Sequence, residues 1–214
     1  MRKYLAEGIG TFALVFCGTG AIVINDVTGG TVTHVGVAIT FGLIVTAMIY
    51  AFGHISGAHI NPAVSIAFAV TDRFDEKKVF PYIIAQLIGA LIASAILAYL
   101  FKEHEGLGAT LPVGEWQQTF ILEIILTYIL MLVILFVSQN KAVTEFTGLA
   151  VGFVVLLEAM FAGPITGASM NPARSIAPAL VSGNLTHLWI YIVAPIIGAL
   201  LASGTWFLLK EEKG

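Results

Sequence analysis

Charged residues are scarce in this chain. Asp, Glu, Lys and Arg together make up 11% of its 214 residues, whereas soluble domains carry about 25%. Hydrophobic residues make up 58%, and the mean hydropathy is +0.94. Such a composition excludes an ordinary soluble domain and predicts an integral membrane protein.

Cysteines and basic clusters are also nearly absent. Cys17 is the only cysteine, so an internal disulfide is impossible and a cysteine-built metal site is not expected. His54 and His59 have no Cys or Asp at ligand spacing, so we expect neither a metal nor another cofactor. The net charge is −3 and no basic cluster could neutralise a row of phosphates, which argues against a nucleic-acid partner.

Long apolar runs are abundant instead. A helix needs about 20 apolar residues to cross roughly 30 Å of hydrocarbon. Six segments qualify, at about 4–24, 33–52, 79–101, 116–138, 143–162 and 186–209. Two further apolar segments, 61–70 and 171–181, reach only about half that depth at ~1.5 Å per residue. They are predicted to be half-helices that enter the membrane and return.

The basic residues predict the topology. Arg174 lies within a short segment and Lys102 follows the third span, but the remaining eight all fall in alternate connections or at the termini. These eight are Arg2, Lys3, Arg73, Lys77, Lys78, Lys141, Lys210 and Lys213. These eight residues lie on one side of the membrane only if both short segments enter the membrane and return, one from each face. The positive-inside rule makes that side cytoplasmic. We therefore expect both termini in the cytoplasm and the protein in the cell membrane.

One short peptide occurs twice. "ISGAHINPAVSIA" begins at Ile55 and "ITGASMNPARSIA" at Ile165, and nine of their 13 positions are identical. "VFPYIIAQLIGALIAS" (79–94) and "LWIYIVAPIIGALLAS" (188–203) match at almost the same offset. Each half thus has three spans and one half-helix, and an odd number of spans inverts the second half. We expect a single channel domain, 1–214, with inverted repeats at about 1–101 and 115–210.

The Asn-Pro-Ala motifs read as helix starts, because Asn is a strong N-cap and Pro favours the first helical position. Their residues are Asn61, Pro62, Ala63, Asn171, Pro172 and Ala173. Half-helices from opposite faces would bring both N-termini together at mid-membrane. Each end carries about half a positive charge, which repels cations, while the asparagine amides can donate to a neutral solute.

These features resemble the aquaporin, or major intrinsic protein, family. "SGAHINPAV", "GASMNPARS", the six spans and a Glu in the first and fourth spans carry the resemblance, which covers essentially the whole chain. It implies an all-α, right-handed bundle of six transmembrane helices and two re-entrant half-helices. It also implies one pore per chain and a homotetramer in the lipid bilayer. "AGPITGASMNPARS" is most similar to the nodulin-like branch and its bacterial relatives.

The resemblance also places a four-residue constriction, the selectivity filter, at Phe41, Ala159, Ala168 and Arg174. Water-selective members have His where Ala159 stands, so the filter should be wider and more apolar here. An arginine in a narrow tube adds a cation barrier and donates to solute oxygens. Glycerol-conducting members usually have Trp and a second aromatic in the filter, and both are absent.

Three buried carboxylates could indicate a different mechanism. Glu7 and Glu123 are equivalent in the two repeats, and the family suggests that each accepts hydrogen bonds from its re-entrant loop. Proton coupling is the other interpretation. Glu158 has no counterpart carboxylate and adjoins Ala159; it could face a neighbouring helix or bond the outer loop.

The leading prediction is a passive channel for water and small uncharged solutes that excludes protons and ions. Its solutes would be glycerol and, from the nodulin-like resemblance, urea or neutral metalloid acids. A strictly water-selective channel is the first alternative, and a proton-coupled transporter is the second. The sequence shows no nucleophile–base pair that would indicate an enzyme.

Overall fold

The computed structural model describes residues 1–210, and its regular elements there are all helices. Six are long and apolar enough to cross a membrane, as predicted. They are α1 (Arg2–Val27), α2 (Thr33–Ser56), α4 (Val79–Leu100), α5 (Trp116–Val137), α6 (Thr147–Thr166) and α8 (Leu188–Leu209). The short helices are α3 (Pro62–Val70) and α7 (Pro172–Ser182), with single 3-10 turns η1 (Glu76–Lys78) and η2 (Thr144–Phe146). Lys213, which was counted in the topology, lies outside the described residues.

The second and fifth spans extend beyond their predicted ends. α2 continues to Ser56 and α6 to Thr166, although the apolar runs indicate ends near 52 and 162. Each helix ends at a left-handed glycine, Gly57 with φ +89° or Gly167 with φ +82°. Backbone hydrogen bonding and the glycine therefore decide where these helices end, and hydropathy does not.

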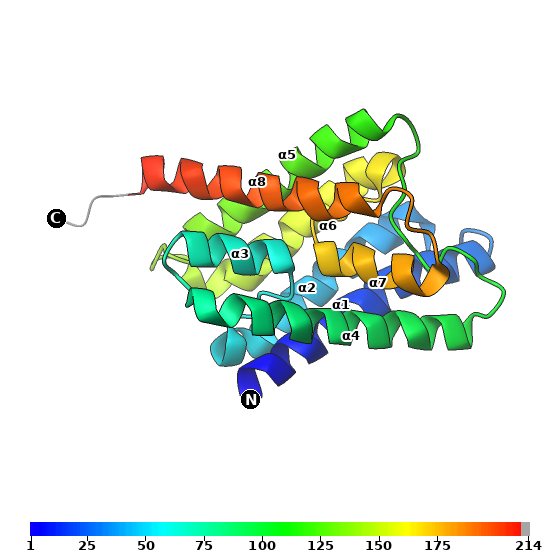
Figure 1. Ribbon diagram of the computed structural model, residues 1–214, viewed down its shortest axis with the longest axis horizontal. Helices are drawn as coiled ribbons and strands as arrows, with labels where there is room; N and C mark the ends of the chain where they lie inside the picture. The colour runs from blue at the N-terminus through cyan, green and yellow to red at the C-terminus, as the bar shows by residue number, and fades with distance from the viewer. Residues whose placement is uncertain (211–214) are drawn as a thin grey trace.

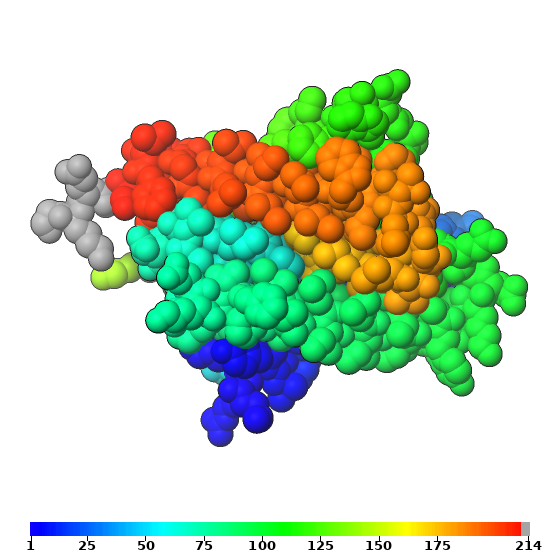
Figure 2. Space-filling view, in the orientation of Figure 1, coloured from blue at the N-terminus to red at the C-terminus, as the bar shows by residue number. Residues whose placement is uncertain are grey.

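The two halves are inverted copies. α1 packs on α4 and α5 on α8, while α2 and α6 pack on each other. Figure 1 shows α4 and α8 running in opposite directions, with α3 and α7 pointing to opposite ends of the bundle. Both short helices contact α4 and α8, and the face in Figure 2 shows them filling the space between those two helices.

Small residues permit the closest helix contacts. A Cβ added to Gly89 of α4 would collide with the carbonyl oxygen of Gly8 in α1. A Cβ added to the equivalent Gly198 of α8 would likewise collide with the carbonyl oxygen of Ile124 in α5. Close approach of backbones is what small residues provide in membrane helix pairs. Gly89 and Gly198 therefore serve helix packing.

The connection after α3 is tied to the other half. Arg73 donates to the carbonyl oxygen of Leu135 (3.1 Å) and to Ser138 Oγ (2.9 Å) at the end of α5. Outside the bundle, the Lys78 ammonium lies 2.8 Å from a carboxylate oxygen of Asp75. This hydrogen bond lowers the pKa of the exposed Asp75 carboxyl.

Candidate functional site

The two re-entrant loops share an unusual backbone. Ala58 and Ile60 have φ of +45° and +43°, and their counterparts Ala168 and Met170 have +41° and +54°. Residues other than glycine rarely adopt this left-handed backbone conformation. Residues so strained persist only where their surroundings hold them.

The Glu7 carboxylate of α1 binds the first re-entrant loop through hydrogen bonds. One oxygen of its buried carboxylate accepts from Ser56 Oγ (2.7 Å) and the His59 amide (2.9 Å). The other accepts from the Ile60 amide (2.7 Å) and Gln86 Nε2 (2.8 Å). Four donors on one carboxylate fix the loop where the left-handed residues lie.

Glu123 does the same for the second loop. Its Oε1 accepts from Thr166 Oγ1 (2.8 Å) and the Ser169 amide (2.9 Å), and its Oε2 accepts from the Met170 amide (2.9 Å). These hydrogen bonds are the ones that the family resemblance suggested for Glu7 and Glu123. Neither carboxylate lines the central cavity.

The two asparagines link the halves. Asn61 Oδ1 accepts from the Ala63 amide (2.9 Å) and caps α3, while Asn171 Oδ1 accepts from the Ala173 amide (3.0 Å) and caps α7. Their NH2 groups then cross over: Asn61 donates to the carbonyl oxygen of Met170 (2.8 Å) and Asn171 to that of Ile60 (2.9 Å). An amide NH2 has two hydrogens. One on each asparagine therefore remains available to a solute.

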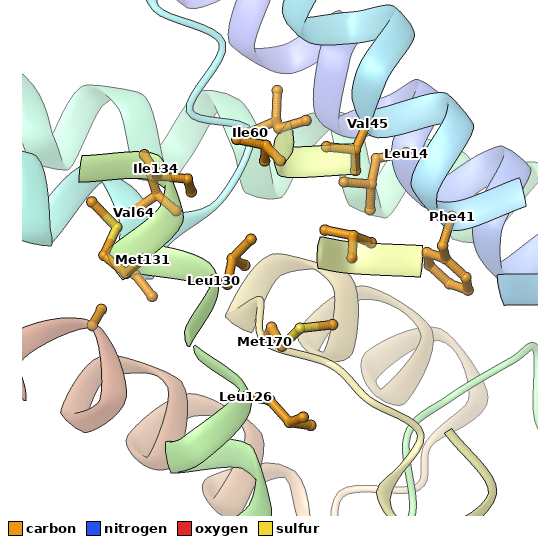
Figure 3. Packing of buried hydrophobic residues seen from close by; sticks show 14 of the residues in the cluster. Leu14, Phe41, Val45, Ile60, Val64, Leu126, Leu130, Met131, Ile134 and Met170 are labelled. Carbon is orange, nitrogen blue, oxygen red and sulfur yellow. The ribbon is translucent and has the colours of Figure 1, made fainter. Parts of the chain in front are cut away.

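A cavity of about 110 Å³ passes both asparagines. His59 and Phe68 line it on the α3 side of the asparagines, and Ser138 and Thr147 line it at the ends of α5 and α6. Much of its wall is apolar, and Figure 3 shows Leu14, Val45 and Leu130 among the side chains gathered there. Buried Pro62, Ala63, Pro172 and Ala173 lie at the starts of the half-helices rather than on the cavity wall.

All four predicted filter residues line this cavity. Phe41 comes from α2, Ala159 from α6, Ala168 from the second loop and Arg174 from α7. The Arg174 Cζ lies 5.1 Å from the centroid of the Phe41 ring. Arg174 is only 2% exposed, and no carboxylate among residues 1–210 forms a salt bridge with it.

The connection between α4 and α5, residues 101–115, which the predicted topology makes an outer loop, supplies a contact that the sequence did not suggest. Arg174 Nη1 donates to the carbonyl oxygen of Gly108 (2.8 Å), and Thr110 Oγ1 donates to Ser175 Oγ (2.7 Å). A backbone carbonyl leaves no mark on residue type, so Gly108 could not be found from sequence.

Two buried tyrosines, Tyr82 and Tyr191, also hold the re-entrant loops, and the sequence does carry a sign of this role. The Tyr82 and Tyr191 hydroxyls donate to the carbonyl oxygens of Ser56 (2.9 Å) and Thr166 (2.7 Å), where the re-entrant loops begin. Both tyrosines lie at the same place in the longer repeated segment. Their duplication was the available sign of a loop-holding role.

Glu158 is brought to neither the cavity nor the outer loop. It is 3% exposed on α6, and neither carboxylate oxygen has a hydrogen-bond partner among residues 1–210. Glu158 is therefore buried within the bundle, away from the cavity and without a hydrogen bond to the 101–115 loop.

A membrane-spanning bundle with inverted halves, whose half-helices meet on a central cavity, is the architecture of a membrane transport protein. The family model described as major intrinsic protein matches residues 1–206. The chain belongs to the major intrinsic protein family, a family of channels, and is an integral membrane protein.

Similar proteins agree with this assignment. Aquaporin NIP1-1 from Zea mays is 49% identical over 96% of this chain and 73% of its own length. Nodulin-26 from Glycine max is 46% identical over 96% of this chain and 76% of its own. The crystal structure of the aquaglyceroporin from Plasmodium falciparum has a TM-score of 0.88 at 28% identity, covering 97% of this chain and 96% of the other.

Proposed function

We propose that the chain is a passive channel for water and small uncharged solutes such as glycerol. The observation that carries the proposal is the cavity, which has an apolar wall and passes the free amide hydrogens of Asn61 and Asn171. A polyol presents hydroxyls to such donors and CH groups to the opposite wall. The similarity to aquaporins and to an aquaglyceroporin supports the same solute class.

The filter residues support a channel wider than one for water alone. Phe41, Ala159, Ala168 and Arg174 combine one fixed cation, one aromatic face and two methyl groups. Ala159 adds neither the bulk nor the polarity of a histidine. Urea and neutral metalloid acids share glycerol's small size and lack of charge, and they belong to the same proposal. A strictly water-selective channel is the alternative.

Ion and proton exclusion follows from the charges at the cavity. Two helix N-termini meet beside Asn61 and Asn171, and Arg174 adds a buried cation. No lining residue in the described chain is Asp or Glu, the residue types that favour cation passage. The hydrogen bonds of Glu7 and Glu123 to their loops favour a structural role over proton coupling.

The chain as a whole forms one channel domain, 1–214, with repeats at about 1–101 and 115–210. It assembles as a homotetramer in the cell membrane with both termini in the cytoplasm. The distribution of basic residues supports this orientation. In Figure 1 the N-terminus and the end of α8 lie toward the same end of the bundle as α3.

Stopped-flow light scattering on proteoliposomes tests the function. We expect glycerol influx well above that of protein-free vesicles, together with fast water flow. Ala159→His should reduce glycerol influx more than water flow, because the imidazole narrows the filter. Equal glycerol rates with and without protein would refute the wide filter. Uphill solute uptake driven by a proton gradient would refute passive conduction.

A further inference from the structure

The outer loop lies directly against the filter. Its Gly108 carbonyl accepts the 2.8 Å hydrogen bond from Arg174 Nη1. Gly108 also packs so tightly on α1 that an added Cβ would lie 2.9 Å from Thr19. Leu107 and Gly108 both have positive φ, +47° and +68°. The carbonyl that holds Arg174 is therefore presented by a strained, closely fitted turn.

His104 supports that turn. Its Nδ1 accepts a hydrogen bond from the Leu107 amide (3.0 Å), so Nδ1 cannot carry a proton. The proton must be on Nε2, which donates to Asp26 Oδ2 at the end of α1 (3.1 Å). Only neutral imidazole, in this tautomer, can accept from Leu107 and donate to Asp26 together.

We propose that His104 is a positioning residue for the selectivity filter, which it sets through Leu107 and the Gly108 carbonyl that binds Arg174. The inference rests on the proposed filter role of Arg174 and goes beyond it. His104 does not line the cavity. Its effect on conduction is indirect, through the orientation of the guanidinium.

Protonation of His104 removes this support. An imidazolium has two N–H donors and no acceptor, so the Leu107 amide loses its partner. Leu107 is 4% exposed, and a buried amide without a partner is costly. Asp26 still attracts the imidazolium, but its side chain is 54% exposed, so water weakens that attraction. The other charged side chains beside His104 in the chain are Lys102, Glu103 and Glu105, all on the same loop.

Loss of the Gly108 contact frees Arg174. Its Nε has no hydrogen-bond partner among the described residues, so the Gly108 carbonyl is an important anchor for the guanidinium. A guanidinium without it turns toward the water of the cavity. The filter then narrows, and glycerol, the larger solute, is slowed more than water.

Two substitutions of His104 separate the loss of its hydrogen-bond acceptor from the gain of its positive charge. His104→Asn offers an amide oxygen to the Leu107 amide and does not titrate. His104→Phe keeps a ring of similar shape and offers no acceptor. His187, on the same face before α8, contacts neither Leu107 nor Arg174 in the described hydrogen bonds, and His187→Asn is the matched control.

The measurement is glycerol and water permeability of proteoliposomes with equal pH on both sides, from about pH 8 to about pH 5. The unmodified protein and His187→Asn should lose glycerol permeability several-fold on acidification, and water permeability less. His104→Asn should stay at the high level throughout, and His104→Phe at the low level. An acid-insensitive parent, or an Asn variant that retains the acid loss, overturns the inference.

These outcomes are distinguishable from failure of the proposed function. A parent protein without glycerol conduction at about pH 8 would refute the channel proposal itself. A parent that conducts at every pH would refute only the role of His104. If His104→Phe does not fold, as judged by gel filtration, the Asn variant alone decides the question.

Discussion

Equivalent positions of the two repeats carry different residues where the protein must be asymmetric. Val64 stands where the second repeat has Arg174, so the cavity wall carries an arginine from one repeat only. Gln86 donates to Glu7, whereas its counterpart Pro195 has no donor to offer Glu123. Met48 stands where the second repeat has Glu158. The Val64/Arg174 and Gln86/Pro195 differences alter hydrogen bonding at the cavity or at its loops, and Glu158 places a buried carboxyl within the bundle.

Glu158 is expected to reduce stability. Because its buried oxygens have no protein donor among residues 1–210, Glu158→Met, which copies the residue at 48, should stabilise the fold. The gain should be about 1 kcal/mol, or ~2–4 °C in the midpoint of thermal unfolding in detergent. Glu158→Gln, which keeps a polar group, is the control and should show no gain. A lower midpoint for the Met variant would contradict the expectation.

Gly18 fixes the position of the Phe41 ring. A Cβ at Gly18 of α1 would collide with that ring, which lines the cavity and belongs to the proposed filter. Gly18→Ala should therefore push Phe41 toward Arg174 and reduce glycerol permeability more than water permeability. Gly204 of α8 has open space beside it, so Gly204→Ala is a matched control. Unchanged glycerol flux in the Gly18 variant would show that the ring can move elsewhere.

At the scale of elements, the re-entrant loops depend on buried carboxylates. In Glu7→Gln the new NH2 group must face one of two backbone amides, that of His59 or that of Ile60, and both are donors. At least one hydrogen bond to a charged acceptor would be lost and a buried amide left without a partner, at a cost of about 2 kcal/mol or more. Reduced folded yield and a lower unfolding midpoint are expected. Glu145→Gln, on an exposed turn, should change neither.

The architecture was largely predictable because it depends on patterns that the sequence repeats. Hydropathy located the six spans, and the duplicated Asn-Pro-Ala peptide located both half-helices. The caps at Asn61 and Asn171 follow from residue type alone. Segments with such strong local preferences need little tertiary information.

Contacts made by backbone atoms could not be predicted. The crossed hydrogen bonds from the asparagine NH2 groups end on the carbonyl oxygens of Met170 and Ile60, and Arg174 ends on that of Gly108. Every residue has a carbonyl, so no composition marks the one that is used. The positive φ of Ala58 and Ala168 was equally hidden, since alanine does not favour it.

At the scale of the molecule, inversion of the repeats has a consequence for orientation. An inverted bundle presents a half-helix to each face, so the fold alone does not tell inside from outside. The proposed filter residue Arg174 and the loop with His104 lie toward only one face, whereas Arg73, Lys77 and Lys78 lie at the other. The positive-inside rule then predicts that the proposed filter lies on the outer side.

Cysteine labelling tests this orientation in intact cells. Cys17→Ser removes the only native thiol, and single cysteines at Glu76 or Glu145 would probe the basic face while those at Glu105 or Thr186 probe the filter face. A membrane-impermeant maleimide should label positions 105 and 186 in intact cells and positions 76 and 145 only after lysis. The reverse pattern would place the filter, and its acid-sensitive loop, inside the cell. Labelling of all four in intact cells would show mixed insertion, which the one-sided distribution of basic residues opposes.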